Sequence, residues 1–109
     1  MNIINLTPHA IVIVKDDGSR LTLPPTSPTA RIQQHNAVYQ FVDDIPVSQV
    51  VYGEVEHLPA PQPDTIYIVS AMVAQQCRER TDVMAPDTGA TAMRDAAGQI
   101  VAVRDFVRY

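Results

Sequence analysis

The stretch Thr65-Ile66-Tyr67-Ile68-Val69-Ser70 decides how the rest of this 109-residue chain is interpreted. Its first five residues are all β-branched or aromatic, and such residues favour extended strands. The Ser70 hydroxyl can accept a hydrogen bond from the free amides of a first helical turn. Residues 71–80 are helix formers without Gly or Pro. The stretch therefore predicts a strand over 65–69, followed by the chain's one short helix near residues 70–80.

Further segments on both sides of this stretch have the lengths of short strands and are bounded by turn residues. The turns are predicted at Asp16-Asp17-Gly18, Asp43-Asp44 and Asp95–Gly98, and a break at His35-Asn36. Gly53, inside a predicted strand, indicates a bulge or a close backbone approach. The expected strands are 2–6, 10–14, 21–23, 29–34, 37–42, 46–56, 65–69 and 99–104, and residues 90–94 form either a further short strand or a loop. We expect one β-rich domain over residues 1–109, mainly β and marginally α+β. Its architecture would be a small barrel or a strongly curved antiparallel sheet of about seven or eight strands.

Composition excludes several classes of protein. Hydrophobic residues make up 46% of the chain and charged residues 18%, as in a globular protein rather than a disordered one. The net charge of −4 argues against general nucleic-acid binding, which needs a concentrated positive surface. Cys77 is the only cysteine, so it forms no internal disulfide and belongs to no multi-cysteine metal site. No apolar run has the length of a membrane span, and we expect a cytoplasmic protein.

The residues that carry recognised catalytic chemistry do not form a complete set. His9, His35 and His57 are isolated in the sequence, and no catalytic residue, metal site or cofactor is predicted from them. Asp87-Thr88-Gly89-Ala90 resembles the active-site string of aspartic proteases, but Pro86 precedes it and only a short segment follows. The alternative is a tight turn in which the Asp87 side chain bonds its own backbone. We favour that alternative, and we interpret Cys77 as a small buried hydrophobic residue.

Two loops have residues that can hold an anion. Each combines hydroxyl groups and small residues with an arginine, whose planar guanidinium grips phosphate or carboxylate in two-point contact. Tyrosine rings such as Tyr67 can stack on a nucleobase. The candidate ligand-binding residues are Thr26, Ser27, Thr29, Arg31, Tyr67, Asp87, Thr88, Gly89, Thr91 and Arg94. The alternative is that both loops are solvated turns, that the tyrosines pack within strands, and that the excess of Arg over Lys reflects a GC-rich genome.

Several strings resemble a family of small proteins found in tailed phages and high-GC bacteria. They are Asn5-Leu6-Thr7-Pro8-His9-Ala10-Ile11, Tyr52-Gly53-Glu54-Val55-Glu56-His57-Leu58-Pro59, residues 65–70, residues 85–89, and Gly98-Gln99-Ile100-Val101-Ala102-Val103-Arg104. The similarity spans nearly the whole chain. The family offers no activity that can be transferred residue by residue, so the resemblance implies a phage context rather than a mechanism.

This context favours one function among three. Small β-rich phage proteins include sponges, which sequester the nucleotide signals made by bacterial defence systems. We expect a homo-oligomeric protein that binds a nucleotide-derived, phosphate-bearing small molecule and acts against host defence, in the host cytoplasm if a phage encodes it. One alternative is an enzyme that cleaves such a signal, with His9 the first residue to test. The other is a structural or protein-blocking phage protein without a ligand.

Overall fold

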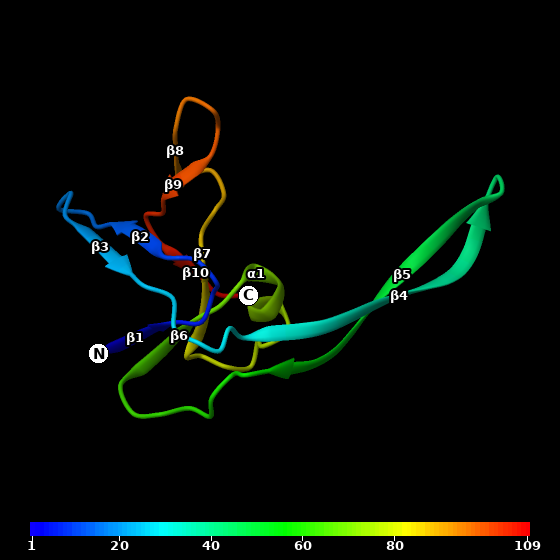
Figure 1. Cartoon of the computed structure of the whole chain (residues 1–109), viewed down its shortest axis with the longest axis horizontal. Coiled ribbons are helices and arrows are strands. Elements are labelled where there is room, and N and C mark those ends of the chain that lie inside the picture. Colours follow the sequence, from blue (N-terminus) through cyan, green and yellow to red (C-terminus); the bar gives the residue numbers. More distant parts are fainter.

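Ten strands and one short helix make up the structure, a computed structural model that describes residues 1–109 (Figure 1). The elements are β1 (Asn2–Asn5), β2 (Ile11–Val14), β3 (Arg20–Leu23), β4 (Arg31–Val42), β5 (Ile45–Glu56), β6 (Thr65–Ile68), α1 (Ala71–Gln75), β7 (Val83–Pro86), β8 (Met93–Arg94), β9 (Ile100–Ala102) and β10 (Phe106–Val107). The expectation of a mainly β chain with one short helix is confirmed.

The deciding stretch forms β6, a central strand of the only sheet with more than two strands. The order of that sheet is β1-β6-β7-β10. β6 runs parallel to both β1 and β7, whereas β10 is antiparallel to β7. The prediction of a purely antiparallel sheet is therefore wrong. The reason is the helical connection from β6 through α1 to β7, because a crossover returns the chain to the same end of the sheet and makes the strands parallel.

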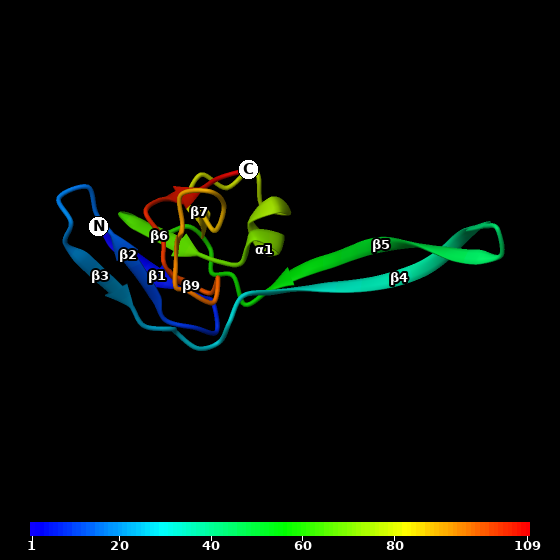
Figure 2. The same cartoon turned by 90° about the horizontal axis from the view of Figure 1, so that it is seen from above.

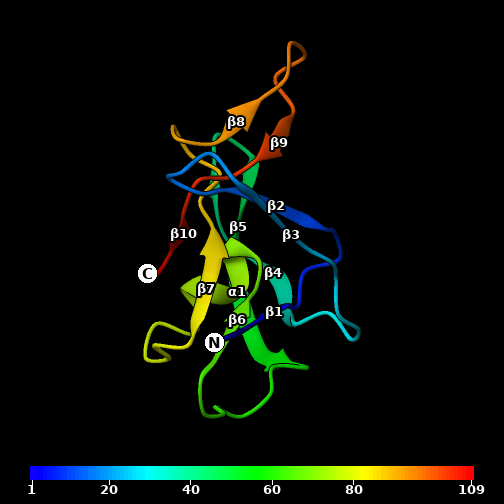
Figure 3. The ribbon, with the colours of Figure 1, turned by 90° about the vertical axis from the view of Figure 1, so that its left-hand side faces the viewer.

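The remaining strands form three separate hairpins, β2–β3, β4–β5 and β8–β9. One isolated parallel bridge joins Ile13 of β2 to Val103, just after β9. The structure has no closed barrel, because no hairpin extends the central sheet into a ring: β2–β3 and β8–β9 lie beside it, and β4–β5 projects away from it (Figure 1). Figure 3 shows β2–β3 and β8–β9 as distinct hairpins above the central strands.

Alternation along β6 gives the body two apolar clusters, one on each face of the central sheet. The side chains of Tyr67 and Val69 belong to the helix-side cluster, which also contains Leu6, Ala30, Val73, Ala74, Cys77, Val83 and Ala85. Ile68 belongs to the hairpin-side cluster, with Ile11, Ile13, Leu23 and Val103. Because successive side chains of a strand point to opposite faces, β6 has to be apolar at every position. This explains the uninterrupted apolar run of the deciding stretch.

The helix is shorter than its sequence predicts. Ser70 caps it as expected, since its Oγ accepts a hydrogen bond from the Val73 amide at 3.3 Å. The helix nevertheless ends at Gln75, and the predicted continuation to Arg80 is wrong. Residues 76–82 instead form turns that bring the chain back to Val83, where β7 pairs with β6. Tertiary pairing overrides helix propensity here, because propensity contributes only tenths of a kcal/mol per residue.

A long two-stranded arm projects from the body (Figures 1 and 2). It consists of β4 and β5, each 12 residues long, joined by a turn in which Asp43 and Asp44 both have positive φ. The predicted turn is confirmed, but the predicted strand break at His35-Asn36 is wrong, because β4 is continuous there. At Gly53 the register shifts as expected, and an added Cβ would lie 3.1 Å from Gln33 Cβ. We call residues 33–54 the arm.

Candidate functional site

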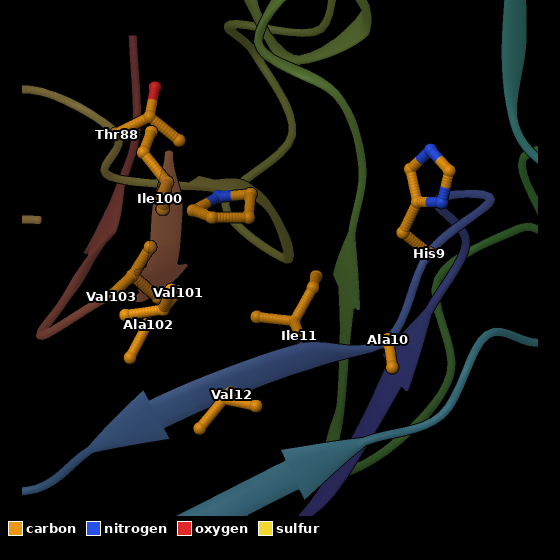
Figure 4. Close-up of a pocket in the computed structure, with 10 residues that line it drawn as sticks. His9, Ala10, Ile11, Val12, Thr88, Ile100, Val101, Ala102 and Val103 are labelled. Carbon is orange, nitrogen blue, oxygen red and sulfur yellow. The ribbon is translucent and has the colours of Figure 1, made fainter. Parts of the chain in front are cut away.

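One pocket of about 280 Å³ lies between β2 and the β9 segment (Figure 4). Its walls are mainly apolar, and His9 and Thr88 supply the polar side chains, at opposite ends of the pocket. The lining residues are His9, Ala10, Ile11, Val12, Pro86, Thr88, Ile100, Val101, Ala102 and Val103. Ile100 and Val101 are 39% and 47% exposed, so the pocket presents apolar surface to solvent.

A buried asparagine fixes the rim near His9. The Asn5 side chain is 1% exposed, and its Nδ2 donates hydrogen bonds to the carbonyl oxygens of His9 at 2.8 Å and Leu23 at 3.0 Å. Its Oδ1 accepts from the Thr7 amide at 2.9 Å and from the Thr7 hydroxyl at 2.6 Å. A side-chain amide in this position replaces the backbone partners that the turn lacks. Asn5 therefore holds the turn that leads from β1 to His9 and into β2.

The other end of the pocket is held by Arg94. Its Nη1 donates to the Gly98 carbonyl at 2.9 Å, and its Nη2 donates to the Thr88 carbonyl at 3.2 Å. Arg94 forms no salt bridge, and its side chain lies in an exposed part of the surface. The guanidinium charge is therefore balanced by carbonyl dipoles and not by a carboxylate, and it lies close to a residue that lines the pocket.

The loop between β7 and β8 is held by a hydrogen bond within it and by two to Asp105, which directly precedes β10. Asp87 Oδ1 accepts from the Gly89 amide at 3.0 Å, which confirms the local Asp-Thr-Gly turn favoured by the sequence. The Asp87 amide donates to the Asp105 carbonyl at 3.0 Å. Thr91 Oγ1 donates to Asp105 Oδ1, also at 3.0 Å. Of this group of candidate residues, only Thr88 lines the pocket, while Asp87, Gly89 and Thr91 shape the loop beside it.

The other candidate loop lies elsewhere. Thr26 and Ser27 are exposed and Thr29 is half-buried, in the segment that leads from β3 to Arg31 at the start of β4. The Thr26 amide donates to the Asn5 carbonyl at 2.8 Å, which ties this segment to the end of β1. Figures 1 and 3 show this segment next to the start of β4, apart from the β8–β9 hairpin. The structure therefore does not bring the two candidate loops together within one chain.

Tyr67 occupies a position that does not suit ligand stacking. Its side chain is 1% exposed in the helix-side cluster, and its hydroxyl lies 3.4 Å from the Ala60 carbonyl oxygen. The interpretation of Tyr67 as an open ring face is wrong, because its strand is covered on both faces. The alternative, strand packing, describes this residue.

The apolar walls of the pocket were not identified from the sequence. Residues 10–12 and 100–103 have the β-branched composition of core strands, and no local signal distinguishes a packed strand from one that borders a gap. The sequence indicates His9 only as the candidate base of an enzyme.

Comparisons with protein-family models, curated proteins and solved structures returned no match. No helix of the chain has the length and apolar character required to cross a membrane.

Proposed function

We propose that this protein binds a small phosphate-bearing ligand of nucleotide type, with its apolar part in the pocket and its phosphate beside Thr88 and Arg94. The observation that carries the proposal is the Arg94 guanidinium, which lies against the Thr88 carbonyl and has no carboxylate partner. Its remaining N–H donors are free for an anion. Contacts between guanidinium and phosphate are charge-assisted and stronger than neutral hydrogen bonds.

The volume of the pocket limits the size of the ligand. At about 280 Å³ the pocket is slightly smaller than the roughly 300–1,000 Å³ of most small-molecule sites. Such a volume suits one base or sugar. A ligand with two nucleotides would need additional walls, which a second copy of the chain can supply. For a ligand of that size, the homo-oligomer that we propose would place its ligand sites near subunit boundaries.

We extend the proposal to sequestration as an anti-defence sponge of a tailed phage, on the family resemblance of the sequence strings. A sponge removes a signal by binding it and needs no catalytic residues. The loop geometry fits this role, since Asp87 and Thr91 are occupied by intramolecular hydrogen bonds.

Each of the two alternative functions is supported by one structural observation. His9 lines the pocket, which favours an enzyme that cleaves the ligand, because an imidazole can act as a base near neutral pH. The arm carries exposed apolar side chains, which favours a structural or protein-blocking protein that has no ligand.

The first experiment separates these three functions. The protein is incubated with cyclic dinucleotides and ADP-ribose derivatives, and each nucleotide is quantified in the filtrate before and after heat denaturation of the protein. A sponge depletes a nucleotide and returns it unchanged on heating. Cleaved products would assign the protein to the enzymes, and His9→Ala would then be the first variant to test. Absence of depletion across the set would favour the structural alternative.

The second experiment tests the position of the site by titrating Arg94→Ala against Arg20→Ala. A charge-assisted contact contributes about 1.5–3 kcal/mol, so Arg94→Ala should weaken binding roughly ten- to a hundred-fold. Arg20 is exposed at the start of β3, away from the pocket, and its replacement should leave affinity nearly unchanged. Melting curves accompany both titrations. If Arg94→Ala lowers the melting temperature while affinity persists, Arg94 only holds the loop and the site lies elsewhere.

A further inference from the structure

The arm exposes an unusual amount of apolar surface for a two-stranded ribbon. Eight large apolar side chains of the arm are between 40% and 68% exposed: Val38, Tyr39, Phe41, Val42, Ile45, Val50, Val51 and Tyr52. β4 and β5 pair only with each other, so each strand has one edge without hydrogen-bond partners. An isolated two-stranded hairpin is marginally stable in water, and an open apolar edge invites pairing with another strand. The arm therefore requires a covering partner.

The charges of β4 differ sharply from those of β5. Arg31 opens β4, and no other formally charged residue occurs along that strand. The β5 strand carries Glu54 and Glu56 near the body, and Pro46 near the turn. Proline removes a backbone donor, and charged residues on an edge discourage pairing. The β5 edge is therefore protected, whereas the β4 edge is open.

We infer that the β4 edge binds the β4 edge of a second copy of this chain, antiparallel about a two-fold axis at Asn36. The regular register from Gln34 to Val38 supplies an uninterrupted segment centred on that residue. The two arms would then form a four-stranded ribbon in the order β5-β4-β4-β5. This inference concerns a surface away from the pocket and does not depend on the proposed ligand.

Charge complementarity selects this partner and this edge. In the antiparallel arrangement, the Asp43-Asp44 turn of one copy lies near Arg31 of the other, because both strands have 12 residues and overlap along their length. None of these three residues has a salt bridge to its own chain. Pairing through β5 would instead bring the same turn toward Glu54 and Glu56, where like charges repel.

Pairing at the β4 edge also buries apolar surface. The exposed side chains of Val38, Tyr39, Phe41 and Val42 lie on β4 and gain neighbours on the partner strand, whereas the other four lie on the outer β5 strands. Backbone hydrogen bonds between the two β4 edges add to this burial, as in other cases of strand addition.

Cysteine cross-linking in the full-length chain tests the axis directly. At a two-fold axis between antiparallel strands, the two copies of residue 36 have Cα atoms about 4.5–5.5 Å apart, within disulfide range. Asn36→Cys should therefore give a covalent dimer under mild oxidation. The matched control is Val50→Cys, because Val50 is the direct partner of Asn36 across the hairpin and is exposed. In the proposed ribbon, the two copies of residue 50 are three strand spacings apart, about 14 Å, and should not cross-link.

Light scattering on the unmodified chain provides the second readout. A dimer of twice the 12.0 kDa chain mass is expected at micromolar concentration, and Val38→Lys with Phe41→Lys, both on β4, should raise the dissociation constant at least a hundred-fold. Met72→Lys is the control, because Met72 is 43% exposed on α1, outside the arm. A monomeric unmodified chain, cross-linking at position 50 instead of 36, or dissociation by Met72→Lys alone would each overturn the inference.

Discussion

Asn5 Nδ2 lies 3.0 Å from the carbonyl oxygen of Leu23 and joins the end of β1 to the end of β3 across 18 residues of sequence. The same nitrogen donates to the His9 carbonyl. One buried side chain therefore determines where β2 begins and how its partner β3 ends. Because β2 forms one wall of the pocket, Asn5 links the core to the candidate site.

Replacing Asn5 with Ala should destabilise the protein by about 2–4 kcal/mol, because buried polar groups lose their partners and a cavity remains. Urea unfolding at neutral pH measures the change. Thr7→Val is a milder comparison, since it removes only the Thr7 hydroxyl, which contacts Asn5 Oδ1 and the His9 carbonyl oxygen. Equal effects of the two variants would contradict a central role for Asn5.

The Arg80–Asp82 pair should make stability depend on pH. Nε and Nη2 of Arg80 contact the two carboxylate oxygens at 2.8 and 2.9 Å, and this guanidinium holds the pKa of Asp82 below its usual value. A depressed folded-state pKa contributes stability above the unfolded-state value of about 3.9, and that stability is lost as pH falls through the folded-state pKa. Asp82→Asn should cost about 1 kcal/mol at pH 7, and the difference from the unmodified chain should shrink below pH 4.

Urea midpoints of the two proteins between pH 7 and pH 2.5 measure this difference. Asp16→Asn serves as the control, because Asp16 is exposed and belongs to no salt bridge. A constant difference between Asp82→Asn and the unmodified chain across this range would show that the ion pair does not contribute to acid sensitivity.

Cys77 should be chemically inert in the folded protein. It is 5% exposed in the helix-side cluster, and burial raises the pKa of its thiol, with a further contribution from Glu79. The thiolate is the reactive species, so both effects slow alkylation. Iodoacetamide at pH 8 should label the thiol at least tenfold faster in 6 M urea than in buffer. Equal labelling rates would place Cys77 at the surface.

The Ser70 cap of α1 should contribute measurably to the free energy of unfolding. Ser70→Ala removes the acceptor for the Val73 amide and should cost about 1 kcal/mol. Ser70→Asp keeps an acceptor at the same position and should recover most of the loss. Thermal unfolding compares the three proteins. If Ser70→Asp is as unstable as Ser70→Ala, the hydroxyl is not acting as a cap.

Local signals predicted local structure well in this chain. Turn residues at 16–18, 43–44 and 95–98 correspond to three hairpins, and the β-branched stretch at 65–69 forms β6. The sequence contains no comparable local signal for the pairing of strands that are distant in the chain. Parallel pairing of β1 with β6 depends on a crossover, and the short β10 was not expected because two residues carry too little pattern. The strand expected over 46–56 is present as β5, but its sequence does not indicate that no other element of the chain covers most of the arm.

Of the candidate residues, Thr88 lines the pocket and Arg94 contacts its carbonyl, whereas Tyr67, predicted to offer a ring face for stacking, is buried. The loop residues were recognisable because hydroxyl groups, glycine and arginine have chemistry that does not depend on the fold. The pocket itself arises from the way β9 meets β2 through the Ile13–Val103 bridge, and such packing between short strands is not encoded in either strand alone.

The cross-strand pair of Arg31 with Glu56 has a consequence for how this chain can vary. The chain leaves the body and re-enters it at adjacent positions, so the segment between them is topologically an insertion. Adding or removing matched residue pairs near the tip would change its reach by about 3.3 Å per pair without moving the body. In the proposed ribbon, related chains with a longer or shorter segment here would differ in the distance between the two bodies while keeping the same core.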